Sequence, residues 1–267
     1  MATRLAVFGG VYSNHLALRA VLDDAERRGE TAWCLGDAGG FGPSPGKSVA
    51  LLRERGVRMI QGNYDHAIGH ALGDCGCGYT DPRDNRFAQL SYDYTNARVS
   101  PAAREWLCAL PPHARWTIEG RRVLLCHGSP RRVNEFLWDS QCPDAFLAWL
   151  LREYEADVLL CSHTGLHWQR ELEGGGHVVN VGAIGRPAHD GRTSTCRAAL
   201  TFDGPRLSVE FRNVVYDHEA LAREMESEGL PAEFVETIRT GWWTTCLENM
   251  PSRERARERS GEPAARP

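Results

Sequence analysis

The first half of the chain alternates short apolar runs with amphipathic segments. Runs of four or five mainly apolar residues are separated by stretches in which leucine and valine recur every three or four positions. The short runs predict buried strands, and the longer spacing predicts helices. We therefore expect strands at 5–8, 31–35 and 57–60 and helices at 14–28 and 48–55. This alternation favours a parallel sheet in an α/β fold.

The second half of the chain is richer in strand-like runs. Apolar runs predict strands at 115–118, 122–126, 158–161, 168–172, 178–181, 198–202 and 207–211. A Gly-, Asp- and Cys-rich stretch at 66–83 predicts a loop insertion, and two helices are expected within 84–110 and one at 143–154. Asp203-Gly204, between the last two strands, is typical of a hairpin turn.

After the last predicted strand, the sequence pattern changes from strand-like runs to helical spacing and then to a polar tail. Helical spacing favours helices at 217–229 and 231–240, and an Arg/Glu-rich and then Pro/Ala-rich composition follows. We expect one α/β domain over 1–215, a C-terminal helical extension over 216–250 and a disordered tail over 251–267.

Composition restricts the class of protein more than its function. The chain has 267 residues, 42% apolar and 25% charged, which suits one large domain with a full core. The net charge of −4 makes nucleic acid an unlikely partner but leaves room for a local basic pocket. No apolar run reaches membrane-span length, and the N-terminus has no signal-peptide pattern. Nine cysteines, several in strand-like runs, are interpreted as mainly reduced thiols of a cytoplasmic protein.

Four apolar runs end in a residue able to bind a metal. The runs are "CLGD", "MIQGN", "VLLCHGS" and "VLLCSH", and the polar residues are Asp37, Asn63, His127 and His163. Strands that end in such residues place them at the edge of an α/β sheet where ligands bind. Two oxygen and two imidazole ligands suit a divalent or mixed-valence transition metal such as manganese, iron or zinc.

Five ordered motifs resemble those of the calcineurin-like metallophosphoesterases. They are "CLGDAGGFGPSP", "QGNYDHAIG", "LLCHGSPRRVNEFLW", "LLCSHTGLH" and "VVNVGAIGRP", and the resemblance spans about residues 4–212. Among these enzymes the chain looks most like the small bacterial branch of diadenosine-tetraphosphatase-like phosphatases and phosphodiesterases. The resemblance implies a two-sheet β-sandwich flanked by helices, in four layers, and a two-metal site.

Carried over position by position, one of the two metal sites is complete and the other is degenerate. One ion of the family is bound by the Asp of Gly-Asp, the Asn of Gly-Asn, the isolated His and the first His of the final pair. All four of these ligands are present here, as Asp37, Asn63, His127 and His163. The other ion loses every ligand that it does not share. Gly10 and Tyr12 stand where the family has Asp and His, and Gly165 stands where it has the last His. We therefore expect one firm ion and a second that is absent or rebuilt.

Substitution of the family's Gly-Asn-His-Asp motif changes the chemistry expected of this site. Tyr64 stands where the family His contacts the phosphoryl group, while Asp65, which would orient that His, remains. A phenol with a pKa of about 10 is a poorer acid at neutral pH than an imidazole. Tyr64 and Asp65, with Tyr12, are our candidate catalytic residues.

Several further residues leave alternatives open. Tyr12 is either an aromatic side chain packed over an empty site or a phenolate ligand to iron. His15 and His167 either rebuild the first site or are ordinary surface histidines. Arg131 and Arg186 are candidates for binding the substrate anion, although Arg131 and Arg132 also suit a solvated loop.

Two sequence features lie outside the metal-ligand pattern. His66, His70, Cys75 and Cys77 suit either a second zinc site or a loop with two free thiols. Trp242 and Trp243 suit a hydrophobic plug or an oligomer contact. Asn180 is interpreted as structural.

The function expected first is hydrolysis of a phosphomonoester, phosphodiester or nucleotide-like substrate with a metal ion. The alternatives are a one-metal enzyme of another reaction class, such as a lyase or a non-phosphate hydrolase, and a non-catalytic binding protein. A small anionic substrate is the expected partner, and a homo-oligomer is compatible with the sequence.

Overall fold

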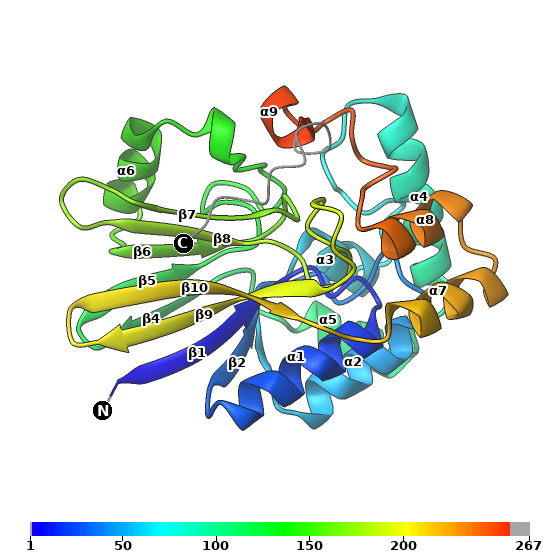
Figure 1. Cartoon of the computed structure of the whole chain (residues 1–267), viewed down its shortest axis with the longest axis horizontal. Helices are drawn as coiled ribbons and strands as arrows, with labels where there is room; N and C mark the ends of the chain where they lie inside the picture. Colours follow the sequence, from blue (N-terminus) through cyan, green and yellow to red (C-terminus); the bar gives the residue numbers. More distant parts are fainter. Residues whose placement is uncertain (1, 257–267) are drawn as a thin grey trace.

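Two five-stranded sheets stack face to face in the computed structural model, which describes residues 2–256 (Figure 1). The first sheet has the order β10 (Arg206–Val214), β9 (Thr195–Asp203), β1 (Thr3–Phe8), β2 (Thr31–Cys34) and β3 (Arg58–Met59). The second has the order β4 (Ala114–Ile118), β5 (Arg121–Leu125), β6 (Val158–Cys161), β8 (His177–Val181) and β7 (His167–Glu171). This arrangement confirms the predicted α/β sandwich.

Both sheets are mixed, with three neighbouring parallel strands and two strands in antiparallel pairing. In the first sheet, β1, β2 and β3 are parallel, and the β9–β10 hairpin pairs antiparallel with β1. In the second, β5, β6 and β8 are parallel, with β4 and β7 antiparallel at the two edges. Because parallel strands end at one edge of their sheet, the loops after β2, β3, β5 and β6 gather at the same end of the sandwich.

Strands buried on both faces explain the continuous apolar runs. In β1, Leu5 and Val7 belong to the core between the sheets, whereas Phe8 packs among the helices on the outer face. In β6, Val158 and Leu160 face the other sheet, and the alternate side chains face α6 (Asp144–Glu153). Burial on both faces leaves no polar alternation in such strands.

Helices cover the outer face of the first sheet and one end of the sandwich (Figure 1). They are α1 (His15–Arg27), α2 (Pro45–Glu54), α3 (Asn63–Gly69), α4 (Pro82–Asn96), α5 (Pro101–Cys108), α7 (His218–Ser227) and α8 (Ala232–Thr240). The expected loop at 66–83 is shorter than predicted, because α3 continues to Gly69. The Asp65 carboxylate accepts a hydrogen bond from the Gly62 N–H, which stabilises the start of that helix.

The C-terminal helices share a hydrophobic cluster with the first half of the chain. Leu221 of α7 and Phe234 of α8 pack with Ala17 of α1, Phe41 and Phe87 of α4. Residues 218–240 therefore form part of the wall around the end of the sandwich where the ligand-bearing loops gather.

The start of the expected tail is ordered. Residues Ser252–Arg255 form the short helix α9, where buried Glu254 accepts hydrogen bonds from the backbone N and the Oγ of Ser140 at 2.8 and 2.6 Å. Ser140 belongs to a 3₁₀ helix, Asp139–Gln141, that was also not predicted. The remaining tail, 257–267, lies outside the described residues. Within residues 2–256, no helix is long and apolar enough to cross a membrane.

Candidate metal centre

The four candidate ligands come from loops at one end of the sandwich. Asp37 follows β2, Asn63 begins α3 just after β3, and His127 and His163 follow β5 and β6. Asp37 and His163 have positive φ angles of 62° and 42°. Such conformations are unfavourable for these residue types and are common where side chains are held for a function.

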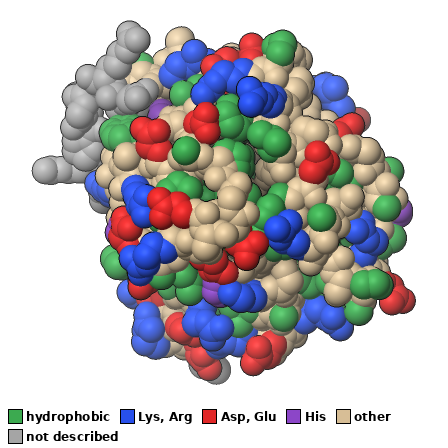
Figure 2. Space-filling model, turned by 90° about the vertical axis from the view of Figure 1, so that its right-hand side faces the viewer, with side chains coloured by type: hydrophobic (Ala, Val, Ile, Leu, Met, Phe, Trp, Pro, Cys, Tyr) green, Lys and Arg blue, Asp and Glu red, His purple; other side chains and the backbone are tan. Residues whose placement is uncertain are grey.

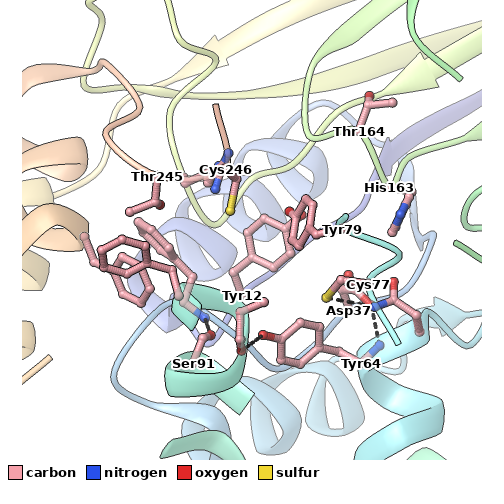
Figure 3. A pocket seen from close by; sticks show the side chains of 17 residues that line it. Tyr12, Asp37, Tyr64, Cys77, Tyr79, Ser91, His163, Thr164, Thr245 and Cys246 are labelled. Carbon is pink, nitrogen blue, oxygen red and sulfur yellow. Dashed lines mark hydrogen bonds between the residues drawn. The ribbon is translucent and has the colours of Figure 1, made fainter. Parts of the chain in front are cut away.

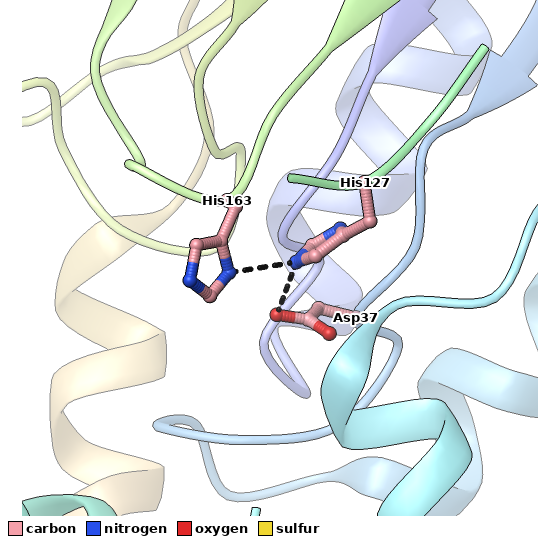
Figure 4. Close-up of side chains that lie close together, drawn as sticks. All are labelled: Asp37, His127 and His163. Carbon is pink, nitrogen blue, oxygen red and sulfur yellow. Dashed lines mark hydrogen bonds and ion pairs between the residues drawn. The ribbon is translucent and has the colours of Figure 1, made fainter. Parts of the chain in front are cut away.

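Asp37, His127 and His163 converge on one point (Figure 4). His127 Nε2 lies 3.2 Å from Asp37 Oδ2 and 3.2 Å from His163 Nδ1. The three side chains are buried, and their candidate ligand atoms all lie within 4.8 Å of one another. Within residues 2–256 this is the one group of three or more His, Cys, Asp or Glu residues with that geometry.

The protonation of the two imidazoles suits metal binding. The His127 Nδ1–H donates to the Leu35 carbonyl at 2.6 Å, so the neutral ring presents the lone pair of Nε2 to the cluster. Burial lowers the pKa of His163 to about 3, and the neighbouring His127 adds to the effect. Burial alone would lower the pKa of His127, but the Asp37 carboxylate outweighs it and raises that pKa. The Asp37 carboxylate therefore favours a positive charge at this point, which a bound cation supplies.

Asn63 contributes the fourth candidate ligand atom. Its Nδ2 donates to the Cys75 carbonyl at 2.9 Å, which fixes the amide. Its Oδ1 is buried without a hydrogen-bond partner in the described part of the chain. Asn63 lines the same pocket as Asp37 and His163. A buried amide oxygen without a partner is costly, and a metal ion would satisfy it. The donor set therefore fits manganese, iron or zinc.

Asp65 joins the two oxygen-bearing loops. Its carboxylate accepts hydrogen bonds from the backbone N–H groups of Asp37, Ala38 and Gly62 at 2.7, 2.9 and 2.8 Å. Burial, with the nearby Asp37 charge, raises the pKa of Asp65 to about 7. These contacts give Asp65 a role in positioning the ligands.

A small pocket opens beside the cluster (Figure 3). Its cavity volume is about 60 Å³, which has room for a few water molecules. Asp37, Asn63 and His163 form one part of the wall, and Tyr12 and Arg186 form another. The remaining lining residues include Phe41, Tyr64, Tyr79, Phe87, Phe234 and Cys246.

Comparison with known proteins assigns the family. The sequence profile of the calcineurin-like phosphoesterase superfamily domain matches residues 4–202, well over half of the chain. The chain belongs to the calcineurin-like phosphoesterase superfamily. Members of this superfamily bind divalent metals, in agreement with the cluster of Asp37, His127 and His163.

Similar proteins cover most of the chain. The uncharacterized protein MJ0912 of Methanocaldococcus jannaschii is 26% identical over 246 residues, which are 85% of this chain and 93% of that protein. The crystal structure of a metallophosphoesterase from Sphaerobacter thermophilus is 26% identical, with a TM-score of 0.68 over 90% of this chain and 100% of that one. The hypothetical protein PH1004 of Pyrococcus horikoshii, 22% identical, matches the fold with a TM-score of 0.74 over 91% of this chain and 100% of that one.

Aromatic rings pack against the positions where the sequence resemblance implied ligands of a first ion. A Cβ atom added to Gly10 would lie 2.6 Å from Ala183 Cβ and 2.9 Å from Tyr12 Cζ. A Cβ atom added to Gly165 would lie 2.9 Å from Cη2 of Trp243. Burial and the Asp37 charge raise the pKa of Tyr12, which opposes a phenolate there. The placement therefore favours the packed-aromatic interpretation of Tyr12.

The Tyr64 side chain lines the pocket, but its hydroxyl is engaged elsewhere. Its Oη donates to the Ala88 carbonyl of α4 at 3.2 Å, and burial raises its pKa. The backbone N–H of Tyr64 donates to Asp37 Oδ1 at 3.0 Å and helps to orient that ligand.

The structure places three other candidates outside this pocket. His15 lies 3.8 Å from Glu224 of α7, and the His167 ring packs on Phe211 with centroids 4.6 Å apart. Neither belongs to the ligand cluster. Arg131 has a side chain that is 37% exposed, pairs with Glu135 and lies over the rings of Phe146 and Trp149. Arg132 also pairs with Glu135 and is more exposed.

The predicted alternatives for the Cys-x-Cys segment both need correction. Cys75 and Cys77 form a disulfide, so this pair is neither two free thiols nor half of a zinc site. The His66 and His70 rings lie 4.5 Å apart, but His70 faces Cys108 at 3.6 Å. The seven other cysteines are free, as predicted. A pairing two residues apart depends on loop conformation, which the spacing alone does not specify.

Trp243 lies behind the pocket residue Arg186, and its place was the one that the sequence predicted least well. It is buried, with its indole N–H donating to the Pro187 carbonyl at 2.7 Å. The double tryptophan was the available signal, but nothing local indicated which part of the site it covers. Asn180 is structural, as expected, because its amide joins Thr164 and Gly182 at 3.0 Å each.

Proposed function

We propose that the protein is a metal-dependent phosphoester hydrolase that works with one ion, held by Asp37, Asn63, His127 and His163. The observation that carries the proposal is the convergence of three buried ligand side chains, with the His127 tautomer fixed by Leu35. Superfamily membership supports the reaction class.

The bound ion would act as a Lewis acid and lower the pKa of a water molecule. In hydrolysis the water oxygen bonds to phosphorus, the ester P–O bond breaks and the leaving oxygen takes up a proton. Asp65 and the Tyr64 backbone N–H keep Asp37 in place for this step. The aromatic wall of the pocket limits the access of bulk water.

The leaving oxygen has no imidazole beside it at position 64. Because the Tyr64 hydroxyl donates to Ala88 and has a raised pKa, it is a weak proton donor at neutral pH. We therefore propose that turnover depends strongly on the acidity of the leaving group, with phenolic esters cleaved faster than alkyl esters.

The surface supports a small anionic substrate as the partner. Figure 2 shows Lys and Arg side chains intermixed with Asp and Glu over the face that carries α7 and α8. A nucleic-acid partner would favour a broad basic area, which this described face does not present.

The test is turnover by protein loaded separately with manganese, iron and zinc. Aryl and alkyl phosphomonoesters, phosphodiesters and a dinucleoside polyphosphate would be assayed with the wild type and with His163→Ala. We expect turnover of at least one ester class that His163→Ala abolishes. Fully metal-loaded protein without turnover of any of these esters would reject the proposal.

A second candidate is a one-metal enzyme of another reaction class. It is favoured by Tyr12 and Trp243, which occupy the positions where a second ion's ligands would lie. One bound ion together with no phosphoester turnover would support this candidate.

A further inference from the structure

Arg186 places a buried positive charge in the pocket, and no carboxylate of residues 2–256 forms an ion pair with it. Its side chain lines the cavity and the residue is 7% exposed. Its Nε is buried with no hydrogen-bond partner among residues 2–256. Buried guanidinium groups are normally paired, because an uncompensated charge in a protein interior is costly.

Ring faces hold the guanidinium in position. Its central carbon lies 3.1 Å from the ring centroid of Trp243 and 5.7 Å from that of Phe41. Trp243 is fixed by hydrogen bonds from its indole N–H to the Pro187 carbonyl and from its backbone N–H to His189 Nδ1, at 2.7 and 2.8 Å. Stacking leaves the N–H groups at the edge of the guanidinium available to an anion.

The same tryptophan connects Arg186 with the lost metal-ligand positions. Trp243 touches the place where a side chain at Gly165 would begin, and a Cβ atom at Gly185 would lie 2.5 Å from Tyr12 Cβ. The Arg186 cation therefore lies among the side chains that replace the first ion's ligands. The pocket thus has a metal centre on one side and a fixed organic cation on the other.

The other residues that line the pocket restrict the charge and the size of a substrate whose anionic group binds Arg186. Arg186 is the one Lys or Arg among the described lining residues, so the pocket suits a single anionic group better than a polyphosphate. Phe41, Phe87 and Phe234 provide an aromatic wall beside it. With a cavity of about 60 Å³, only a compact group fits without movement of the wall.

We propose that Arg186 binds the oxygen atoms of one tetrahedral oxyanion, as the replacement for the first metal ion, and that the substrate is a compact phosphomonoester with an aromatic or other apolar group. The anion site stands on the structure alone, whereas the substrate class rests on the proposed phosphoester hydrolysis.

The anion site is tested by calorimetric titration of metal-free protein with inorganic phosphate. Arg186→Met should weaken binding about 10- to 100-fold, the usual contribution of a hydrogen bond to a charged group. Arg186→Lys should restore part of the affinity, and the exposed-arginine control Arg131→Met should leave it unchanged. Circular dichroism would verify that each variant is folded.

Three results would overturn the anion site. They are no phosphate binding by the wild type, equal binding by the wild type and folded Arg186→Met, and an equal loss in Arg131→Met.

The substrate class is tested with metal-loaded wild type. We expect kcat/KM for phenyl phosphate to exceed that for ATP and diadenosine tetraphosphate by at least about 10-fold, and Arg186→Met to remove most of that preference. Faster cleavage of the polyphosphates would overturn the substrate class. Absence of all turnover with phosphate binding intact would reject the proposed function and leave the anion site in place.

Discussion

Around Asp37 and His163, the ligand atoms of three side chains converge within 4.8 Å. Around Gly10 and Gly165, by contrast, the Tyr12 and Trp243 rings occupy the space, and the Arg186 guanidinium stacks on Trp243. We call the first the ligand side (Asp37, Asn63, His127 and His163) and the second the filled side (Gly10, Tyr12, Gly165, Arg186 and Trp243). Both sides are buried, but only the ligand side presents a set of donors that fits a transition metal.

This difference shows that the filled side not only lacks metal ligands but is also closed by packed side chains. On the filled side, Tyr12 and Trp243 occupy the space that ligand side chains at positions 10 and 165 would need. Trp243 lies beyond residue 202, where the match to the superfamily domain ends. We therefore expect that ligand residues introduced at positions 10 and 165 would not create a second metal site, because Trp243 of the C-terminal segment lies in the way.

The largest expected effect is removal of a residue from the ligand side. His163→Ala should lower metal affinity by about 100- to 1,000-fold, since one ligand of four contributes roughly a quarter of a binding free energy of about 10–16 kcal/mol. Isothermal titration with zinc measures it. His167→Ala, four positions further at the start of β7 and outside the cluster, is the matched control and should bind normally. An equal loss in both variants would contradict the assignment.

The second-largest expected effect is a loss of stability when a ring is removed from the filled side. Trp243→Ala should lower the free energy of unfolding by about 3–5 kcal/mol, because a large buried ring is removed from a well-packed site. Urea denaturation measures this change. Trp242→Ala, at the neighbouring half-buried residue, should cost clearly less. Similar costs for the two tryptophans would show that Trp243 is not a specific filler of the site.

A double-mutant cycle tests whether Trp243 blocks a side chain at position 165. Gly165→Ala should destabilise the wild type by about 2–3 kcal/mol, through both its φ of +76° and the contact with Trp243. In the Trp243→Ala background only the backbone cost should remain, about 1 kcal/mol. If Gly165→Ala costs the same in both backgrounds, Trp243 does not block this position.

The smallest expected effect is a change in metal affinity when the loop that supports Asn63 is altered. The Cys75–Cys77 loop holds Asn63 through the Cys75 carbonyl and through Cys77 Sγ, at 2.9 and 3.4 Å. Replacing both cysteines by serine should weaken zinc binding by about 10-fold, because the ligand loses part of its support but remains. Metal titration of the double variant against the Cys108→Ser control measures this effect. Unchanged affinity would show that the loop does not position Asn63.

Much of the fold was predictable because strands buried on both faces leave unmistakable apolar runs. All ten strands of residues 2–256 coincide with predicted runs, and the helices at 14–28 and 143–154 were placed within a residue or two. The prediction was wrong where structure depends on a polar contact. Helix α3 relies on the Asp65–Gly62 hydrogen bond, and α9 on the long-range contact between Glu254 and Ser140.

Part of the candidate site was also predictable from the sequence, and part of it was not. The ligand side follows from four residues that come at or soon after strand ends, so local sequence placed them together. The filled side depends on the approach of Trp243 to Gly165 across 78 positions of the chain, and no local pattern encodes that contact. Arg131 and Arg186 looked equivalent in the sequence, but Arg131 stacks on the rings of α6 at the surface and Arg186 on a buried tryptophan.

The most direct test of a one-ion site is the number of metal ions per chain. Protein loaded with an excess of manganese, iron or zinc and then freed of unbound metal by gel filtration would be analysed by mass spectrometry of its elements. His163→Ala serves as the control for adventitious metal. One ion per wild-type chain, lost in His163→Ala, is the result we predict; two ions per chain would contradict the account.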